Sequence, residues 1–246
     1  MRVEPGVMLA RLAEERSLQL TGKQIEQYET YYRLLAEWNE KMNLTAITEK
    51  EQVYIKHFYD SLTLSFYYPA DRVRSMADIG SGAGFPGIPL KIAFPHIRLT
   101  IVDSLQKRIG FLQTLCEALG LKDVQCVHAR AEDAARTREH REAYDLVTAR
   151  AVARLNVLAE FCLPFCAKNG VFAAMKGPGA GAELEDAKFA ISELGGEWME
   201  SHNFTLPNHE EAERNIILIR KVKPTPRKYP RKAGVPIKQP LVGNAP

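Results

Sequence analysis

The stretch DIGSGAGFPGIPLK, residues 78–91, decides how the rest of the chain is interpreted. It places four glycines and two prolines between a short apolar run and a segment of helical character. Glycine lacks a Cβ atom, so Gly80, Gly82 and Gly84 allow a ligand to approach the backbone closely. We therefore expect a ligand-binding loop that connects a strand to a helix.

Around this loop, short apolar runs alternate with longer segments of helical period. The runs predict strands at residues 75–78, 98–103, 124–128, 144–148 and 170–175. This alternation is typical of a doubly wound α/β fold, in which helices cover both faces of a mostly parallel sheet. Two later runs, 197–203 and 215–221, have no helix between them and predict an antiparallel hairpin at the sheet edge.

The first seventy residues carry a helical period instead. Thr21 and Gln24 predict a capping box at the start of an amphipathic helix, and a second helical pattern ends at Pro69. The last residues are basic and rich in proline. The sequence thus predicts three parts: a small helical region at 1–70, the α/β domain at 71–223 and a tail at 224–246.

The composition is that of an ordinary globular protein. Of the 246 residues, 46% are hydrophobic and 26% are charged, which excludes a collagen-like or disordered chain. No apolar run has the length of a membrane span, and Glu14, Glu15 and Arg16 interrupt any secretory signal. We therefore expect a cytoplasmic protein with no membrane partner.

The four cysteines form no CxxC pair, and no histidine stands at the spacing of a metal ligand. The sequence therefore predicts neither a metal site nor a disulfide framework. Cys162 and Cys166 are four residues apart, so we expect them on one buried face of an apolar helix.

The net charge of +3 does not by itself indicate a nucleic-acid partner, but the positive charge is unevenly distributed. Residues 214–232 contain eight lysines or arginines and no acidic residue. One interpretation is a solvated, disordered end. The other is a segment that follows a phosphate backbone and offers an aromatic ring for stacking. The candidate RNA contacts are Arg214, Arg227, Lys228, Tyr229, Arg231 and Lys232.

Two ligands could use the glycine loop. The letters GAGFPG, residues 82–87, match the GxGxxG pattern of dinucleotide sites, but Pro86 lacks the N–H that phosphate oxygens need. The alternative is S-adenosylmethionine, which has no phosphate and carries a sulfonium cation. Asp78, an acid at the end of the first strand, suits that cation better.

The ends of the other strands supply further candidates. Asp103 could accept both ribose hydroxyls of either ligand, Ala131 and Glu132 would lie beside the adenine, and Arg150 would stand at the mouth of the same crevice. Each has a structural alternative, because the loop could be only a tight turn, Asp103 a helix cap, and Glu132 with Arg150 a solvated ion pair. The coincidence of four strand ends favours a cofactor site.

Several motifs give the chain a resemblance to the GidB or RsmG family of bacterial methyltransferases. They are EWNEKMNLTAI (37–47), KHFYDSL (56–62), DIGSGAGFPGIPLKI (78–92), RAED (130–133), TARAVA (148–153), MKG (175–177) and YPRKAGVP (229–236). The resemblance implies a class I methyltransferase fold. It also implies S-adenosylmethionine contacts at Gly80, Phe85, Ala131, Glu132 and Arg150, with Asp103 at the ribose.

The same resemblance implies the reaction: methylation of N7 of a guanosine in 16S ribosomal RNA, at guanine 527. The substrate would be that RNA or a precursor of the small ribosomal subunit, and we expect a monomer. Guanine N7 already presents a lone pair, so direct in-line transfer needs no covalent intermediate. The sequence offers neither a nucleophilic cysteine nor the polar clamp used for exocyclic amines, which agrees with catalysis by positioning.

We therefore expect Arg150 and Lys176 to hold the base or its flanking phosphates, while Asn43 and His57 close the pocket. Lys176 could instead be a solvated lysine at a strand end, and His57 a histidine at the edge of the core. Two rival functions remain open: an RNA-binding assembly factor that has lost activity, and an NAD-linked dehydrogenase. The intact Asp78, Gly80, Gly84 and Asp103 argue against the first, and the lack of an evident hydride-site acid or base argues against the second.

Overall fold

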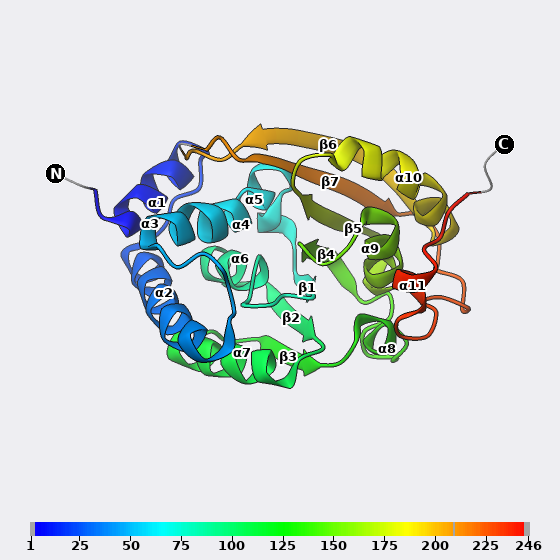
Figure 1. Cartoon of the computed structure of the whole chain (residues 1–246), viewed down its shortest axis with the longest axis horizontal. Coiled ribbons are helices and arrows are strands. Elements are labelled where there is room, and N and C mark those ends of the chain that lie inside the picture. The colour runs from blue at the N-terminus through cyan, green and yellow to red at the C-terminus, as the bar shows by residue number, and fades with distance from the viewer. Residues whose placement is uncertain (1–2, 209, 244–246) are drawn as a thin grey trace.

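A computed structural model describes residues 3–208 and 210–243 of the chain, so residues 1–2 of the helical region and 244–246 of the tail lie outside it. Its centre is a seven-stranded sheet in the order β3-β2-β1-β4-β5-β7-β6 (Figure 1). The strands are β1 (Ser75–Ile79), β2 (Arg98–Asp103), β3 (Val124–His128), β4 (Tyr144–Arg150), β5 (Cys166–Lys176), β6 (Gly196–Thr205) and β7 (Glu213–Lys221).

The direction of the strands confirms the predicted fold class. Strands β3, β2, β1, β4 and β5 pair in parallel. Strand β7 runs antiparallel to both β5 and β6, so β6 and β7 form the predicted hairpin at one edge. The doubly wound order places the carboxyl ends of β1, β2, β3 and β4 beside one another, which is where such sheets bind ligands.

Helices cover both faces of this sheet, as predicted. One face packs against α2 (Gly22–Met42), α6 (Gly87–Ala93) and α7 (Gln106–Ala118), and the other packs against α8 (Ala131–Ala134), α9 (Leu155–Cys162) and α10 (Ala180–Glu193). Successive strand residues alternate between the two cores: Met76 belongs to the first and Ala77 to the second. Because both faces are covered, the strands are apolar on both sides and could be recognised in the sequence as short apolar runs.

The N-terminal helices pack into the first of these two cores. Helix α1 (Pro5–Glu14) precedes α2, whose start shows the predicted capping box between Thr21 and Gln24. The chain then passes through α3 (Lys50–Val53), a π-helix η1 (Tyr54–Tyr59), α4 (Asp60–Leu62), α5 (Leu64–Tyr67) and a 3₁₀ turn η2 (Ala70–Arg72). Tyr28 and Phe58 of this helical region share one core with the sheet, so the packing marks no boundary between the two parts. The limits of the three predicted parts therefore stay a prediction.

The prediction of one apolar helix that contains Cys162 and Cys166 is wrong. Helix α9 ends at Cys162, a 3₁₀ turn η3 (Leu163–Phe165) follows, and Cys166 is the first residue of β5. Pro164 lies in the turn, and its ring and missing N–H prevent the helix from continuing. Both cysteines are nevertheless fully buried, as expected.

The described part of the tail is not a disordered end. It runs back along the face of α8 and α9 (red in Figure 1) and includes the short helix α11 (Val235–Lys238). Arg141 donates hydrogen bonds to the carbonyl oxygens of Tyr229 and Thr225, at 3.0 and 2.8 Å, and so fixes the segment to the domain. Within residues 3–208 and 210–243, no helix is long and apolar enough to span a bilayer.

Candidate functional site

The glycine loop between β1 and α6 has a backbone that only glycine adopts easily. Gly80, Gly82 and Gly84 have φ angles of 71°, 63° and 102°. A Cβ atom on Gly80 would lie 2.7 Å from Val152 Cγ2, and one on Gly84 would lie 2.6 Å from the Tyr31 hydroxyl oxygen. Both approaches are shorter than real Cβ contacts, so the loop depends on its glycines.

Asp78 lies beneath this loop and is completely buried. Its Oδ2 accepts hydrogen bonds from Ser81 Oγ, at 2.5 Å, and from Gly87 N, at 2.8 Å. Its Oδ1 is buried and has no hydrogen-bond partner. Burial raises the pKa of Asp78 to about 6, although both hydrogen bonds act in the opposite direction. A free carboxylate oxygen at the end of β1 suits a positively charged ligand above the loop.

Asp103, at the end of β2, joins this loop to the start of α7. Its Oδ2 accepts from Gly82 N at 3.0 Å, and its Oδ1 accepts from Leu105 N at 2.9 Å. The predicted alternative of a helix cap is wrong, because the N-cap of α7 is Leu105 and Asp103 binds the N–H of that residue instead. The Asp103 side chain also lines the cavity described next.

A cavity of about 290 Å³ opens at the carboxyl ends of β1, β2 and β3. The structure brings four predicted cofactor residues together there: Gly80, Asp103, Ala131 and Glu132. The predicted alternative of a Glu132–Arg150 ion pair is wrong, because Glu132 Oε1 accepts from Gly234 N at 2.9 Å. The remaining lining residues are Ile79, Val102, Ser104, Arg108, Ala129, Arg130, Ala151, Val152, Phe161 and Ile237.

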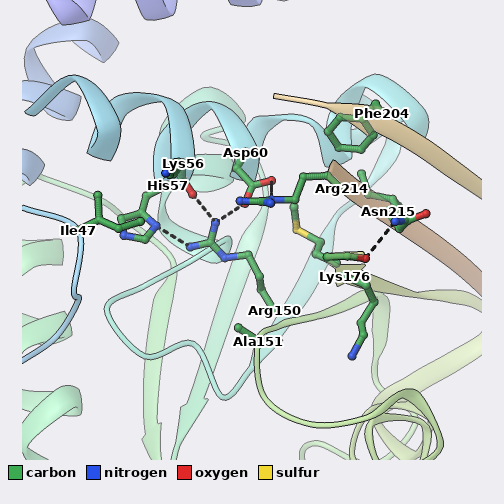
Figure 2. Close-up of a pocket in the computed structure, with 13 residues that line it drawn as sticks. Ile47, Lys56, His57, Asp60, Arg150, Ala151, Lys176, Phe204, Arg214 and Asn215 are labelled. Atoms are coloured by element: carbon green, nitrogen blue, oxygen red, sulfur yellow. Dashed lines mark hydrogen bonds and ion pairs between the residues drawn. The ribbon is translucent and has the colours of Figure 1, made fainter. Parts of the chain in front are cut away.

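A second pocket, of about 330 Å³, lies between β4, β5, β7 and the π-helix η1. Arg150 Nη1 is 2.8 Å from Asp60 Oδ2, and Arg214 Nε is 3.2 Å from Asp60 Oδ1. Figure 2 shows the Arg150 guanidinium between the Asp60 carboxylate and the His57 ring. Two arginines share one buried carboxylate, so this cluster carries one net positive charge.

His57 is held as a neutral ring in this pocket. Its Nδ1 is 3.2 Å from Arg150 Nη2, and because a guanidinium can only donate, Nδ1 accepts this hydrogen bond. Its Nε2 therefore carries the hydrogen and donates to Thr45 Oγ1 at 2.8 Å. Burial first, and then the neighbouring Arg150 charge, lower the pKa of His57 to about 3. The ring orients Arg150 and has no free lone pair for proton abstraction.

Several of the predicted site residues lie differently from what we expected. Asp78, Gly82 and Gly84 do not line the cofactor cavity, and Arg150 lines the second pocket instead. Phe85 does not line the cofactor cavity, because its ring stacks between Tyr31 and His57, with centroids 5.3 and 4.5 Å away. Asn43 is the left-handed C-cap of α2 and does not line the second pocket. Lys176 lines it, but its Nζ is 2.8 Å from Glu183 Oε2 and 2.8 Å from the Ala153 carbonyl oxygen.

The two pockets meet at Ala151, which lines both. It follows directly after β4 and has a φ angle of 56°, a conformation unusual for alanine. Ala151 is therefore a residue that the two pockets share.

Sequence reasoning missed Asp60 and Ala151, and it assigned Arg214 to the tail contacts rather than to the pocket. Asp60 stands in the motif KHFYDSL, three residues after His57, which places the two on one side of the helical segment. That spacing was an available signal. Nothing local indicated that Arg214, on a strand 154 residues from Asp60, would reach the same carboxylate.

The fold is that of the class I S-adenosylmethionine-dependent methyltransferases. Solved structures with this fold include the O-methyltransferase from Bacillus cereus in complex with SAH (TM-score 0.56, 15% identity, covering 78% of this chain and 91% of that one). Another is TrmN from Thermus thermophilus (TM-score 0.54, 16% identity, 67% of this chain and 49% of that one).

Within this class, the chain belongs to the rRNA small subunit methyltransferase G (GidB) family, whose model matches residues 24–217. Ribosomal RNA small subunit methyltransferase G from Bacillus velezensis is 58% identical over 93% of this chain and 95% of that protein. The protein of the same name from Halalkalibacterium halodurans is 60% identical, with the same coverage of both chains. The family resemblance of the sequence motifs is thereby confirmed.

Proposed function

We propose that this methyltransferase transfers the methyl group of S-adenosylmethionine to N7 of a guanosine in 16S ribosomal RNA, at guanine 527 by the family's pattern. The observation that carries the proposal is the meeting of two pockets at Ala151. The first pocket contains the Asp103 and Glu132 carboxylates beside two arginines, and the second contains Arg150 and Arg214 around the Asp60 carboxylate. Relatives at about 58% identity are named as methyltransferases of small-subunit ribosomal RNA, which supports the choice of substrate.

The cavity beside the glycine loop suits the cofactor. Gly80 leaves the backbone open to the ligand, Asp103 offers its carboxylate to the ribose hydroxyls, and Ala131 with Glu132 lies beside the adenine. When bound, the cofactor supplies an electrophilic methyl group on a sulfonium cation. The buried Asp78 carboxylate, with its unpartnered oxygen, adds negative charge beneath the loop.

The arginine pocket suits a guanine base and its phosphates. Arg150 and Arg214 are held at fixed positions by Asp60, and their remaining N–H groups can donate to the guanine O6 or to a phosphate oxygen. Phe204 and Ile47 give the same pocket apolar walls for the flat base. Lys176, already paired with Glu183, adds charge at its rim and is not free to bind the base alone.

The residues of the pocket agree with direct in-line transfer. The Nδ1 atom of His57 is occupied by Arg150, so the ring does not act as a base. Burial raises the pKa of the Cys166 thiol to about 12, so this cysteine does not act as a nucleophile. Catalysis would then come from holding the N7 lone pair in line with the methyl group, which in model reactions lowers the barrier by up to about 7–11 kcal/mol.

The tail contributes fewer RNA contacts than the sequence suggested. Tyr229 is buried and its hydroxyl donates to Glu193 Oε1 at 3.2 Å, so its ring is not available for stacking. Arg231 is bound by the buried Glu160, at 2.6 Å. Exposed side chains remain at Arg227, Lys228 and Lys232. We propose that these three and the half-buried Arg214 contact phosphates.

The test is methyl transfer from radiolabelled S-adenosylmethionine to 16S RNA and to small subunits that lack the modification. The variant Arg150→Ala should lose at least about a hundredfold in kcat/KM, which corresponds to about 2.7 kcal/mol of transition-state binding. Arg154→Ala is the matched control, because Arg154 lies four residues further along the chain and pairs with the exposed Asp186. Equal activity of both variants and the wild type would overturn the assignment of the pocket.

A further inference from the structure

The tail reaches the cofactor cavity, although no sequence motif suggested this. Ile237, in the short helix α11, lines the cavity together with Gly80, Asp103 and Ala131. It comes from the far end of the chain, more than a hundred residues after β3. In Figure 1, α11 lies next to α8 and α9. Ala131 and Glu132 of α8 line the same cavity.

The position of Ile237 is fixed by contacts on its N-terminal side. Glu160, at the back of α9, accepts from the Arg231 backbone N at 2.7 Å and from the Arg231 guanidinium at 2.6 Å. Arg136, just after α8, donates to the Pro230 carbonyl oxygen. Gly234 N then donates to Glu132 Oε1 at 2.9 Å. The tail is thus joined to Glu132, which itself lines the cavity.

Despite this anchoring, the Ile237 side chain is 61% exposed. Val152, on the loop after β4, is a second exposed apolar side chain that lines the same cavity. Apolar surface at the rim of a cavity leaves water when an apolar ligand surface covers it. The faces of an adenine ring are such a surface. Glu132, which we assign to the adenine, binds the backbone of Gly234 and so holds the segment with Ile237 at that end of the cavity.

We propose that Ile237 packs on the adenine of S-adenosylmethionine, so that the tail forms one wall of the cofactor site. This inference rests on the proposed assignment of the cavity to the cofactor. It gives the anchoring of Arg231 and Tyr229 a function, since both hold the segment that presents Ile237. It also explains why the described tail contacts the domain rather than extending into solvent.

The test is calorimetric titration with S-adenosylhomocysteine, which binds without reacting. Ile237→Ala should weaken binding about tenfold, because most of the side chain that the ligand covers is removed. Val242→Ala is the matched control and should stay within twofold, because Val242 is an equally exposed residue of the same tail, 64% exposed, and does not line the cavity. In turnover, Ile237→Ala should raise the KM for S-adenosylmethionine and leave kcat unchanged, with an unchanged melting temperature.

A third variant, Asp103→Asn, separates this inference from the proposed function. If Asp103→Asn weakens binding while Ile237→Ala stays within twofold of the wild type, Ile237 does not contact the cofactor and this inference alone is overturned. If neither variant changes the affinity, the ligand binds elsewhere and the assignment of the cavity is overturned as well. A fall in kcat with unchanged KM for Ile237→Ala would also contradict the inference.

Discussion

Arg150 is the residue at the centre of the second pocket. It contacts Asp60 and His57 with its guanidinium and lies over the Phe85 ring, with its Cζ 5.0 Å from the ring centroid. A lysine could not reproduce these contacts, because it lacks the planar fork that reaches a carboxylate and an imidazole together. The pocket therefore presents an arginine of fixed direction, as the proposed positioning of a base requires.

The neutral state of His57 predicts how the stability of the fold depends on pH. The pKa of His57 is about 3 in the folded chain and about 6.5 in the unfolded chain, so only the unfolded state binds its proton between these values. The free energy of unfolding should therefore fall as the pH is lowered from about 6.5 towards 3. We expect His57→Gln to lose less stability over this range than the wild type, as measured by urea unfolding at several pH values.

Asp78 provides a control with the opposite sign. Its folded pKa of about 6 is higher than the ordinary value of 3.8, so the folded state binds the extra proton between these values and gains stability as the pH falls. Asp78→Asn removes that gain, so this variant should lose stability more steeply than the wild type on acidification. Parallel pH curves for the wild type and both variants would contradict the assigned protonation states.

The glycine loop is the element that joins the N-terminal helices to the sheet. The Tyr31 hydroxyl donates to the Ala83 carbonyl oxygen at 2.6 Å, and the Tyr28 hydroxyl donates to the Pro89 carbonyl oxygen at 2.8 Å. The ring of Phe85, a residue of this loop, stacks on the His57 ring in η1. The loop that borders the cofactor cavity therefore also sets the position of the helical segment that forms the second pocket.

Gly84→Ala should destabilise the protein, because the new Cβ atom would lie 2.6 Å from the Tyr31 hydroxyl oxygen and 2.9 Å from Ile88 Cγ1 at a φ angle of 102°. We expect a loss of more than about 2 kcal/mol in the free energy of unfolding. Gly110→Ala in α7 is the matched control, since nothing lies within 4 Å of its Cβ position. It should gain about 0.5–1 kcal/mol. Equal effects would show that the loop is not closely packed.

Most elements could be predicted because their signals are local. The strands are short apolar runs between helical segments, and the capping box of α2 spans only Thr21 to Gln24. Pro164 was also a local signal that α9 ends before it. We did not use that signal, because the residues around Pro164 form one apolar run. The π-helix η1 was not predictable, because its wider turn depends on the packing of Tyr54 and Phe58 against the aromatic core.

Across the whole molecule, the candidate sites combine segments that are far apart in the chain. The cofactor residues at strand ends were predictable, because one topology rule places them on one edge of the sheet. The Asp60 cluster and the Ile237 wall were not, since each depends on a contact over about a hundred residues or more, such as Glu132 with Gly234. Local periodicity carries no information about such pairs.

The exposed cations predict how RNA binding depends on salt. If Arg214, Arg227, Lys228 and Lys232 each neutralise one phosphate of single-stranded RNA, the logarithm of the affinity should fall with the logarithm of salt with a slope of about −3. The double change Arg227→Ala and Lys232→Ala should reduce the slope to about half. The control is the double change Lys122→Ala and Lys168→Ala. Both lysines are exposed and lie near the amino ends of their strands, away from the carboxyl ends that border the two pockets. A slope near zero for the wild type would exclude phosphate binding by this surface.

The most direct measurement is the mapping of N7-methylguanosine in ribosomal RNA from cells with and without this gene. One position in 16S RNA should lose the methyl group when the gene is deleted. The wild-type gene should restore it, and a gene with Arg150→Ala should not. An unchanged methylation pattern after deletion, or a lost methyl group on another atom or another RNA, would contradict the account.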